Sequence, residues 1–419
     1  MPNCAERAIL FGSLFKFRWW VAALLLSASI LSYFDRLTVS VLKTTLEHQF
    51  AFGDPQYALM VNLFLAAYGT AYIGSGWIVD RIGSRRSLAI FAVAWSIATI
   101  GCGLATSFIQ LAIMQFLLGI AEPGVQPVTV RAAAVWAPPE SRGTFMSICS
   151  MGSSIGAMSA SALISFISIH YNWRLSFVIP GLLGFVVAAV WFATYRDPKS
   201  VTNLLIKTPG RPALPWLSLW GKRSLWGVLL ARFIGDPVWY FVLFWMIGYL
   251  QDYKGATMQQ IGHIAWIPFI AANIGGISLV ALSDFLSRHT PSKVRSRKLV
   301  LSVVSLAAPL CWLIPHTSGL TAAIILFSIL AIVSNTWLYM LSPVIAEIFP
   351  LGNVASIWGI LGAFGSLGAI LSNSLISRFP HTAAGRQAMF IMVGTLPLIA
   401  TAILNLTVRN TPVPIDATE

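Results

Sequence analysis

The sequence predicts an all-α membrane protein whose twelve transmembrane helices form two pseudo-symmetric six-helix bundles. Three observations carry this prediction: an apolar composition, apolar runs of membrane-spanning length, and landmarks that recur in both halves. Of the 419 residues, 57% are hydrophobic and 10% are charged, and the mean hydropathy is +0.77. A soluble domain of this length has too small an interior to hide so much apolar surface.

Apolar segments recur along the chain at the length that crosses a bilayer, roughly 20 residues each. They lie at 19–42, 57–79, 87–106, 109–136, 144–169, 173–195, 225–250, 259–286, 298–315, 319–347, 354–377 and 386–408. Each is expected to be helical, because backbone groups in lipid must be hydrogen-bonded within the segment.

Landmarks in the first half return in the second half at a near-constant offset. Asp80 and Asp284 each close an apolar span and lie 204 positions apart, and Asp35 and Asp236 lie 201 positions apart. This offset indicates duplication, and duplicated six-helix halves predict a site between them near mid-membrane.

The division into domains follows the longest polar connection. It is rich in proline and basic residues and separates an N-terminal bundle, 1–196, from a C-terminal bundle, 225–419. We interpret residues 197–224 as a cytoplasmic linker.

The basic residues predict the orientation of the chain in the membrane. With the N-terminus in the cytoplasm, 19 Lys and Arg residues lie in cytoplasmic segments and 5 lie on the opposite side. Cytoplasmic loops carry such an excess, so both termini are expected inside. The net charge of +13 is thereby explained by topology, and nucleic acid is not expected as a partner.

Motifs for enzymatic chemistry are missing from the sequence. The four cysteines have no metal-ligand spacing, and neither a phosphate-binding loop nor a nucleophile elbow is present. We therefore predict that the protein is no enzyme and holds no metal or cofactor, apart from protons as the coupling ion.

The connection between the second and third spans carries a specific motif, Gly-x3-Asp-Arg-x-Gly-x-Arg-Arg. Its fixed positions are Gly76, Asp80, Arg81, Gly83, Arg85 and Arg86, with Asp284 as the counterpart of Asp80 in the second half. The motif resembles the signature loop of the major facilitator superfamily, which implies the fold of that superfamily and a conformational role for this loop. Anchoring the topology is the alternative for its arginines.

Further segments resemble the anion:cation symporter family of that superfamily, towards its hexuronate and galactonate permeases. They are Tyr33-Phe34-Asp35-Arg36, Gly119-Ile120-Ala121-Glu122, Gly152 to Ala157, Trp173-Arg174 and Arg232 to Trp239. The resemblance implies a carrier of small organic anions in the bacterial inner membrane, working as a monomer.

The resemblance also implies roles for individual residues. Asp35 and Glu122 would be protonated during transport, and Arg36 would hold the carboxylate of the substrate. Tyr33 and Tyr68 would hydrogen-bond the substrate, and Ser153 would occupy a polar contact position in the fifth span.

Gln115 departs from the family pattern. Many members have an arginine seven residues before the glutamate of the fourth span, on the same helix face, and this chain has Gln115 there. Glu122 is therefore expected to lack that cationic partner, and Gln115 is a candidate contact for the substrate.

Physical chemistry supports the same residues independently. Charged groups at membrane depth cost several kcal/mol and usually face a water-filled cavity or a partner. The guanidinium of Arg36 is a planar fork that suits a carboxylate, and a protonated Asp35 would no longer compete for it. The alternative is an ion pair that ties two helices together.

Candidates in the second half are Trp239, Asn335 and Trp337, which are expected to line the substrate cavity. Packing against neighbouring helices is the alternative for each. Arg232 and Asp236, four residues apart, are expected to form a local ion pair.

Together these observations predict proton-coupled import of a sugar acid, such as a hexuronate, or of a similar small carboxylate, by alternating access. Two alternatives stay open: efflux of an amphipathic compound, and a membrane sensor built on a transporter scaffold. Arg36 favours an anion over a neutral amphiphile, and the signature loop favours a carrier over a sensor.

Overall fold

The computed structural model describes the backbone of residues 4–136, 142–196, 216–290, 292–349 and 351–410. Most of the predicted linker, 197–215, lies outside these residues, so the predicted domain boundaries stay predictions. Within the described residues, twelve helical segments are long and apolar enough to span a membrane. This confirms the number of spans predicted from the sequence.

The N-terminal half is built from six spans and one short helix. Its elements are α1 (Cys4–Val41), α2 (Lys43–Phe50), α3 (Asp54–Leu104), α4 (Phe108–Ala121), η1 (Glu122–Gly124), α5 (Val125–Trp136), α6 (Arg142–His170) and α7 (Leu175–Thr194).

The C-terminal half also holds six spans, several of them interrupted. Its elements are α9 (Trp216–Trp220), α10 (Arg223–Phe244), α11 (Met246–Lys254), α12 (Met258–Ile264), α13 (Ile267–Ser287), α14 (Lys293–Ser305), η3 (Ala308–His316), α15 (Leu320–Ile348), α16 (Leu351–Ile376) and α17 (Ala383–Thr407).

Glycine and proline mark where spans bend or join. α3 contains the second and third spans, joined at Gly83, whose φ of 82° is easily adopted only by glycine. Pro123 lies in the 3₁₀ turn that interrupts the fourth span. The predicted span 225–250 is two helices, because the chain breaks at Trp245 between α10 and α11.

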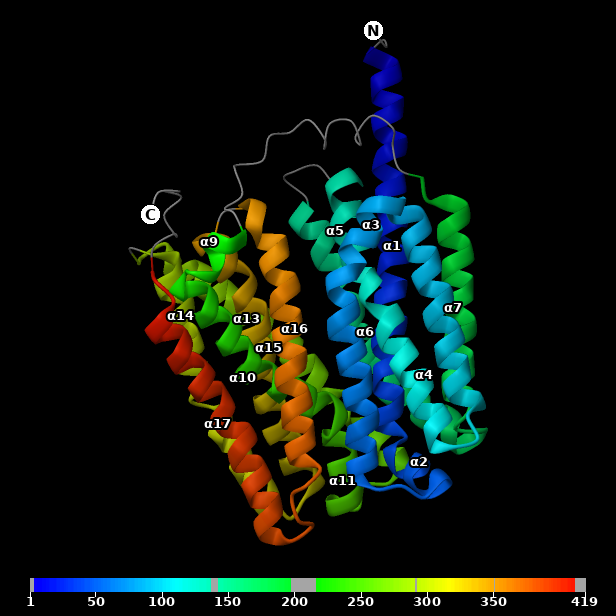
Figure 1. The fold of residues 1–419 in the computed structure, drawn as a ribbon, viewed down its shortest axis with the longest axis vertical. Helices are drawn as coiled ribbons and strands as arrows, with labels where there is room; N and C mark the ends of the chain where they lie inside the picture. The colour runs from blue at the N-terminus through cyan, green and yellow to red at the C-terminus, as the bar shows by residue number, and fades with distance from the viewer. Residues whose placement is uncertain (1–3, 137–141, 197–215, 291, 350, 411–419) are drawn as a thin grey trace.

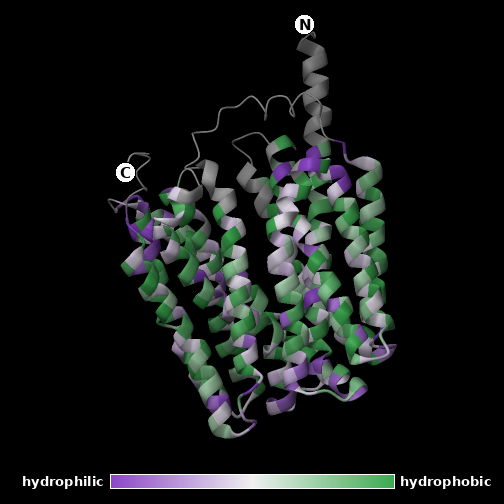
Figure 2. Cartoon of the chain, in the orientation of Figure 1, coloured by the Kyte–Doolittle hydropathy of each residue, from purple (hydrophilic) through white to green (hydrophobic). Residues whose placement is uncertain are grey.

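The two halves stand side by side as bundles and diverge toward one face (Figure 1). We call this face, where α17 ends, the terminal face. The opposite face, where α2 and α11 lie and where α16 connects to α17, brings the halves together (Figure 1). Figure 2 shows apolar residues along the spans and hydrophilic residues gathered toward the two faces, as a bilayer requires.

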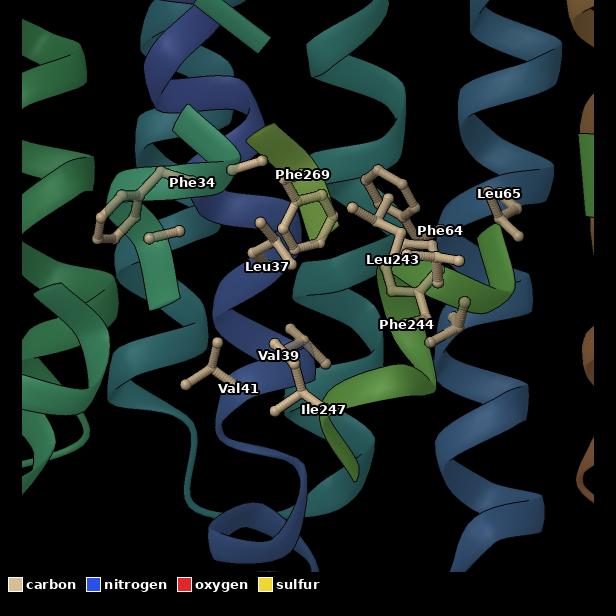
Figure 3. Close-up of a cluster of buried hydrophobic side chains, with 14 of the residues drawn as sticks. Phe34, Leu37, Val39, Val41, Phe64, Leu65, Leu243, Phe244, Ile247 and Phe269 are labelled. Atoms are coloured by element: carbon tan, nitrogen blue, oxygen red, sulfur yellow. The ribbon is translucent and has the colours of Figure 1, made fainter. Parts of the chain in front are cut away.

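An apolar cluster joins the halves near the opposite face. Leu37 and Val41 of α1 lie in one buried cluster with Ile247 of α11, and Phe64 meets Phe244 with ring centroids 6.4 Å apart (Figure 3). Close packing of these side chains leaves little room for a solute between the halves here.

Polar contacts reinforce this junction. The carbonyl of Phe244, at the break between α10 and α11, accepts hydrogen bonds from Tyr57 at 2.8 Å and Ser40 at 3.3 Å. Asn62 of α3 donates to Ser374 of α16 at 2.8 Å. The helix break thus presents a backbone acceptor that the N-terminal half uses.

A buried lysine completes the closure of the opposite face. The Nζ of Lys43 lies 2.9 Å from Glu47 and 2.8 Å from Asp54, both in its own half, and 2.9 Å from Asp252 of α11. Burial lowers the pKa of Lys43, but the carboxylates of Asp54 and Asp252 raise it by a larger amount, so the net shift of the pKa is upward. We call these four residues the lysine latch.

Candidate substrate and proton site

The centre of the site is an ion pair between α1 and the break in the fourth span. The Nε of Arg36 donates to Glu122 at 2.6 Å, with the two side chains 7% and 0% exposed. Glu122 is the first residue of the 3₁₀ turn, and Pro123 is the second. The local change of helix geometry presents the Glu122 carboxylate to α1. Two opposite charges therefore lie paired at membrane depth.

Aromatic rings surround the Arg36 guanidinium. Its Cζ lies 4.4 Å from the ring centroid of Tyr68, 5.0 Å from that of Tyr33 and 5.6 Å from that of Phe64. Ring faces attract a cation and hold its plane, so they position the guanidinium without neutralising it. Two of the sequence-predicted contacts, Tyr33 and Tyr68, are among these rings.

Asp35 lies apart from this pair. It is 1% exposed, and one carboxylate oxygen accepts a hydrogen bond from Thr99 at 3.0 Å, inside the N-terminal bundle. Its other oxygen has no hydrogen-bond partner among the described residues. The expectation that Asp35 competes for Arg36 is therefore corrected: the carboxylate that holds Arg36 comes from Glu122, 86 positions away.

Glu122 has no arginine at position 115 to pair with, and its cationic partner here is Arg36 of α1. Gln115 is buried and its side-chain nitrogen lies 3.5 Å from the sulfur of Cys102, within the N-terminal bundle. This place favours packing over substrate contact for Gln115.

A pocket lies between the halves, beside Tyr33. It encloses about 310 Å³ of space outside the atoms, including open solvent. Its lining comes from α1, α6, α10, α13 and α15: Tyr33, Ser153, Ala157, Trp239, Phe269, Asn273, Asn335, Leu338 and Tyr339. The fold thus brings Tyr33, Ser153, Trp239 and Asn335, four of the predicted contacts, to one pocket.

The pocket offers both hydrogen-bond donors and acceptors. The hydroxyl of Tyr339 donates to Asn273 at 2.6 Å, and the amide nitrogen of Asn335 is buried without a partner among the described residues. Amides and hydroxyls of this kind suit the hydroxyl groups of a polyol. Tyr339 was missed in the sequence, although it follows Asn335 by one helical turn and so shares its face.

Trp337 lies elsewhere. Its indole nitrogen donates to Thr401 at 3.1 Å and to Ser305 at 3.3 Å, within the C-terminal bundle, and it is 4% exposed. Since it turns away from the pocket, its position favours packing over substrate contact.

Arg232 and Asp236 pair within α10, as their spacing predicts. The Nε of Arg232 donates to Asp236 at 2.7 Å, and the ring of Trp358 lies 4.9 Å from the Arg232 Cζ. The C-terminal half thereby contains a buried arginine whose Nε is held by a carboxylate, as in the N-terminal half.

The arginines of the signature loop have different surroundings. Arg85 donates to the carbonyl of Phe192 at 2.8 Å, and the Cζ of Arg81 lies 5.0 Å from the ring of Trp77. Arg86 is exposed. The side chain of Asp80 lies outside the described residues, so the role of this loop stays a prediction.

Asp284, the counterpart of Asp80 in the second half, forms an ion pair with Arg297. Asp284 lies 2.9 Å from the Nη2 of Arg297, which also lies 2.8 Å from Glu347. The ends of three helices, α13, α14 and α15, are tied together by this one guanidinium. Gly76, near the end of the second span, has open space where a Cβ would lie.

The described residues hold no group of three His, Cys, Asp or Glu side chains arranged to bind a metal ion. The polar groups that the site offers are its ion pairs, its tyrosines and the amides of the pocket.

The sequence is similar to those of several curated transporters. The hexuronate transporter of Escherichia coli strain K12 is 25% identical over 410 residues, covering 94% of this chain and 95% of that protein. The galacturonate transporter of Dickeya chrysanthemi is 27% identical over 304 residues, covering 69% and 88%. A probable galactarate/D-glucarate transporter of Escherichia coli strain K12 is 24% identical over 412 residues, covering 91% and 93%.

Solved structures share the fold. A bacterial homolog of the human lysosomal transporter Spinster, in an inward-facing and occupied conformation, gives a TM-score of 0.74 at 22% identity, covering 94% of this chain and 97% of that one. A D-xylose-proton symporter gives a TM-score of 0.70 at 15% identity, covering 93% of this chain and 98% of that one.

The family model of the Major Facilitator Superfamily matches residues 25–343. The chain therefore belongs to the Major Facilitator Superfamily and is a membrane transporter, not an enzyme.

Proposed function

We propose that this transporter imports a sugar acid, or a similar small carboxylate, together with protons. The observation that carries the proposal is the buried contact of 2.6 Å between Arg36 and Glu122, beside a pocket rich in amides and hydroxyls. An arginine is a strong ligand for a carboxylate, and here an internal carboxylate occupies it.

Coupling follows from competition for Arg36. While Glu122 is ionised it holds the guanidinium, and a substrate carboxylate meets a neutral pair. A proton on Glu122 removes that negative charge and leaves Arg36 to bind the incoming anion, while the hydroxyl groups of the substrate reach Asn273 and Asn335. Release of the proton restores the ion pair and expels the anion.

Asp35 is the second proposed protonation site. Its unpartnered oxygen is buried, and an ionised carboxylate with an unfilled acceptor is costly there. A proton on that oxygen offsets the cost, which fits a carrier that loads protons before it moves.

The direction of transport rests on two features. The halves meet at the opposite face and diverge at the terminal face (Figure 1), and most basic residues of the sequence belong to the terminal side. We propose that the terminal face is cytoplasmic, so that this arrangement opens inward, and that alternating access moves the opening across the membrane.

The test is uptake of labelled galacturonate into proteoliposomes with the outside more acidic. Accumulation is expected for the native protein, and is expected to collapse when a protonophore removes the gradient. Arg36→Ala should abolish both uptake and the stabilisation of the detergent-solubilised protein by sugar acids.

The matched control is Arg223→Ala, which changes an exposed arginine of α10 that donates to the Leu406 carbonyl at 3.1 Å. It should transport normally. Stabilisation by neutral amphiphiles alone, with no response to any carboxylate, would rule out the proposal in favour of efflux, and binding without flux would favour a sensor.

A further inference from the structure

The largely buried pair of Arg232 and Asp236 has no part in the proposed function as stated above. It lies on α10, in the half that does not contain Arg36, and its side chains are 11% and 15% exposed. A small part of each side chain is thus accessible, unlike Glu122, whose side chain is fully covered. A structural tie within one helix needs no such access.

The Arg232 guanidinium also has an unfilled donor. Its Nη1 atom is buried and has no hydrogen-bond partner among the described residues, although Asp236 holds Nε. A buried donor without an acceptor costs about 1–3 kcal/mol, and more when the group is charged. The ring of Trp358 covers the guanidinium face and offers it no acceptor oxygen. A carboxylate is the strongest hydrogen-bond acceptor for such a guanidinium donor.

Tyrosines connect this arginine to Arg36. Tyr68 lies against Arg36, and its ring centroid is 5.8 Å from that of Tyr72 on the next turn of α3. Tyr72 interacts electrostatically with both Arg36 and Arg232, and Tyr240 interacts with Arg36 and with the partner of Arg232. Both guanidinium groups therefore lie near the same phenol groups, those of Tyr72 and Tyr240.

Two glycines of α16 make room for this arrangement. A Cβ at Gly365 would lie 2.0 Å from the Asp236 Oδ2 and 3.3 Å from the Arg232 Nε, so any larger residue displaces the pair. A Cβ at Gly362 would lie 3.5 Å from the ring of Tyr72, in ordinary contact. α16 thus lets α3 of one half and the charged pair of the other approach closely.

We infer that Arg232 is a second carboxylate subsite, and that the substrate is therefore a dicarboxylic sugar acid, held by Arg36 at one end and by Arg232 at the other. The inference rests on the proposed function and narrows its substrate class. A diacid bridges the two halves by charge, whereas a hexuronate has one carboxylate and engages Arg36 alone. The hydroxyl groups of either acid meet the same phenols and amides.

The test compares binding of galactarate, a six-carbon diacid, with binding of galacturonate, the corresponding monoacid, to the purified full-length protein by calorimetry. The native protein should bind galactarate at least about tenfold more tightly. Arg232→Gln should remove this advantage and leave the affinity for galacturonate unchanged. Asp236→Asn, which frees Arg232 from its competitor, should keep the advantage or increase it.

Arg223→Gln, on the same helix, is the matched control and should bind both acids as the native protein does. Equal loss of both acids in Arg232→Gln, with a normal melting temperature, would overturn the second subsite, as would equal native affinity for diacid and monoacid. Both of these outcomes leave the proposed function standing. Failure of the native protein to bind either acid would overturn the proposed function as well.

Discussion

The stability and the binding properties of Arg36 both depend on which carboxylate it is paired with. Its contact with Glu122 is a charge-assisted hydrogen bond in a place with almost no water. Removing one member of such a pair typically costs about 3–5 kcal/mol, because the other member stays buried and unpaired. In the proposed mechanism, protonation of Glu122 leaves Arg36 unpaired, and the carboxylate of the substrate binds Arg36 in its place.

Glu122→Gln and Asp35→Asn separate the two proposed protonation sites. Glu122→Gln leaves Arg36 charged without its partner, so sugar-acid binding should be kept or tightened while proton-driven accumulation is lost. Asp35→Asn preserves an acceptor for Thr99, so the fold should survive, and exchange of labelled for unlabelled substrate should continue without accumulation.

The measurement is counterflow exchange set beside gradient-driven uptake in the same proteoliposomes. A variant that loses binding together with accumulation would show that its carboxylate is structural. Full gradient-driven uptake by Glu122→Gln would contradict the competition for Arg36.

At the scale of elements, the lysine latch is a tie between α2 and α3 of one half and α11 of the other. Lys43 is 2% exposed, and its aliphatic stem packs over Gly248, where a Cβ would lie 2.6 Å from the lysine Cδ. Opening of the opposite face must separate Lys43 from Asp252. The latch therefore biases the equilibrium between the two openings.

Lys43→Met is expected to shift that equilibrium toward opening of the opposite face. Of the three ion pairs that the change removes, only the one with Asp252 joins the two halves, and the Asp252 side chain is 31% exposed. The shift is therefore expected to be about 1 kcal/mol, or about fivefold in the ratio of the two openings. Spin labels at His48 and Arg378, both exposed, should report longer distances.

Lys254→Met is the control, because Lys254 bonds to the Thr317 carbonyl within its own half. The pH dependence has a defined sign. The folded-state pKa of Lys43 is raised, so its ion pairs are complete below the ordinary lysine value of about 10.4 and are lost as the pH rises through the raised value. Loosening of the latch between about pH 7 and about pH 9 would contradict this assignment.

For the whole molecule, the proposed alternating access requires the halves to part at the opposite face. Thr44 of α2 and Gln251 of α11 hydrogen-bond across that junction, with 3.3 Å between their side-chain oxygens. A covalent link there should hold the opening at the terminal face and stop turnover, since alternating access needs both openings.

Oxidation of the double variant Thr44→Cys, Gln251→Cys should therefore reduce uptake to background, and a reductant should restore it. Binding of sugar acid to the oxidised protein should persist, because the cross-link leaves the proposed opening at the terminal face in place. The double variant Ser302→Cys, Asn405→Cys, at a hydrogen-bonded pair within the C-terminal half, is the control. Uptake that continues through a verified cross-link at the opposite face would exclude the proposed movement of the halves.

The glycines of α6 show where a sequence pattern needed the structure to be understood. Gly152 and Gly156 appear in the sequence as part of a family resemblance. A Cβ at Gly156 would lie 2.4 Å from the carbonyl oxygen of Ile30, and one at Gly152 would lie 2.5 Å from Ser29, so both let α6 approach α1. The glycines position Tyr33 and Ser153 at the pocket by allowing this approach.

The sequence by itself determined the number of spans, the charges placed within them and the sharp turn at Gly83. These follow from local properties, since the cost of putting a residue in lipid and the freedom of glycine depend little on distant parts of the chain. The tertiary structure decided that Arg36 pairs with Glu122, that Lys43 joins the halves, and that Trp337 turns away from the pocket. Those outcomes depend on which helix faces meet across long sequence separations, and a buried charge takes whichever partner the packing brings within hydrogen-bond distance.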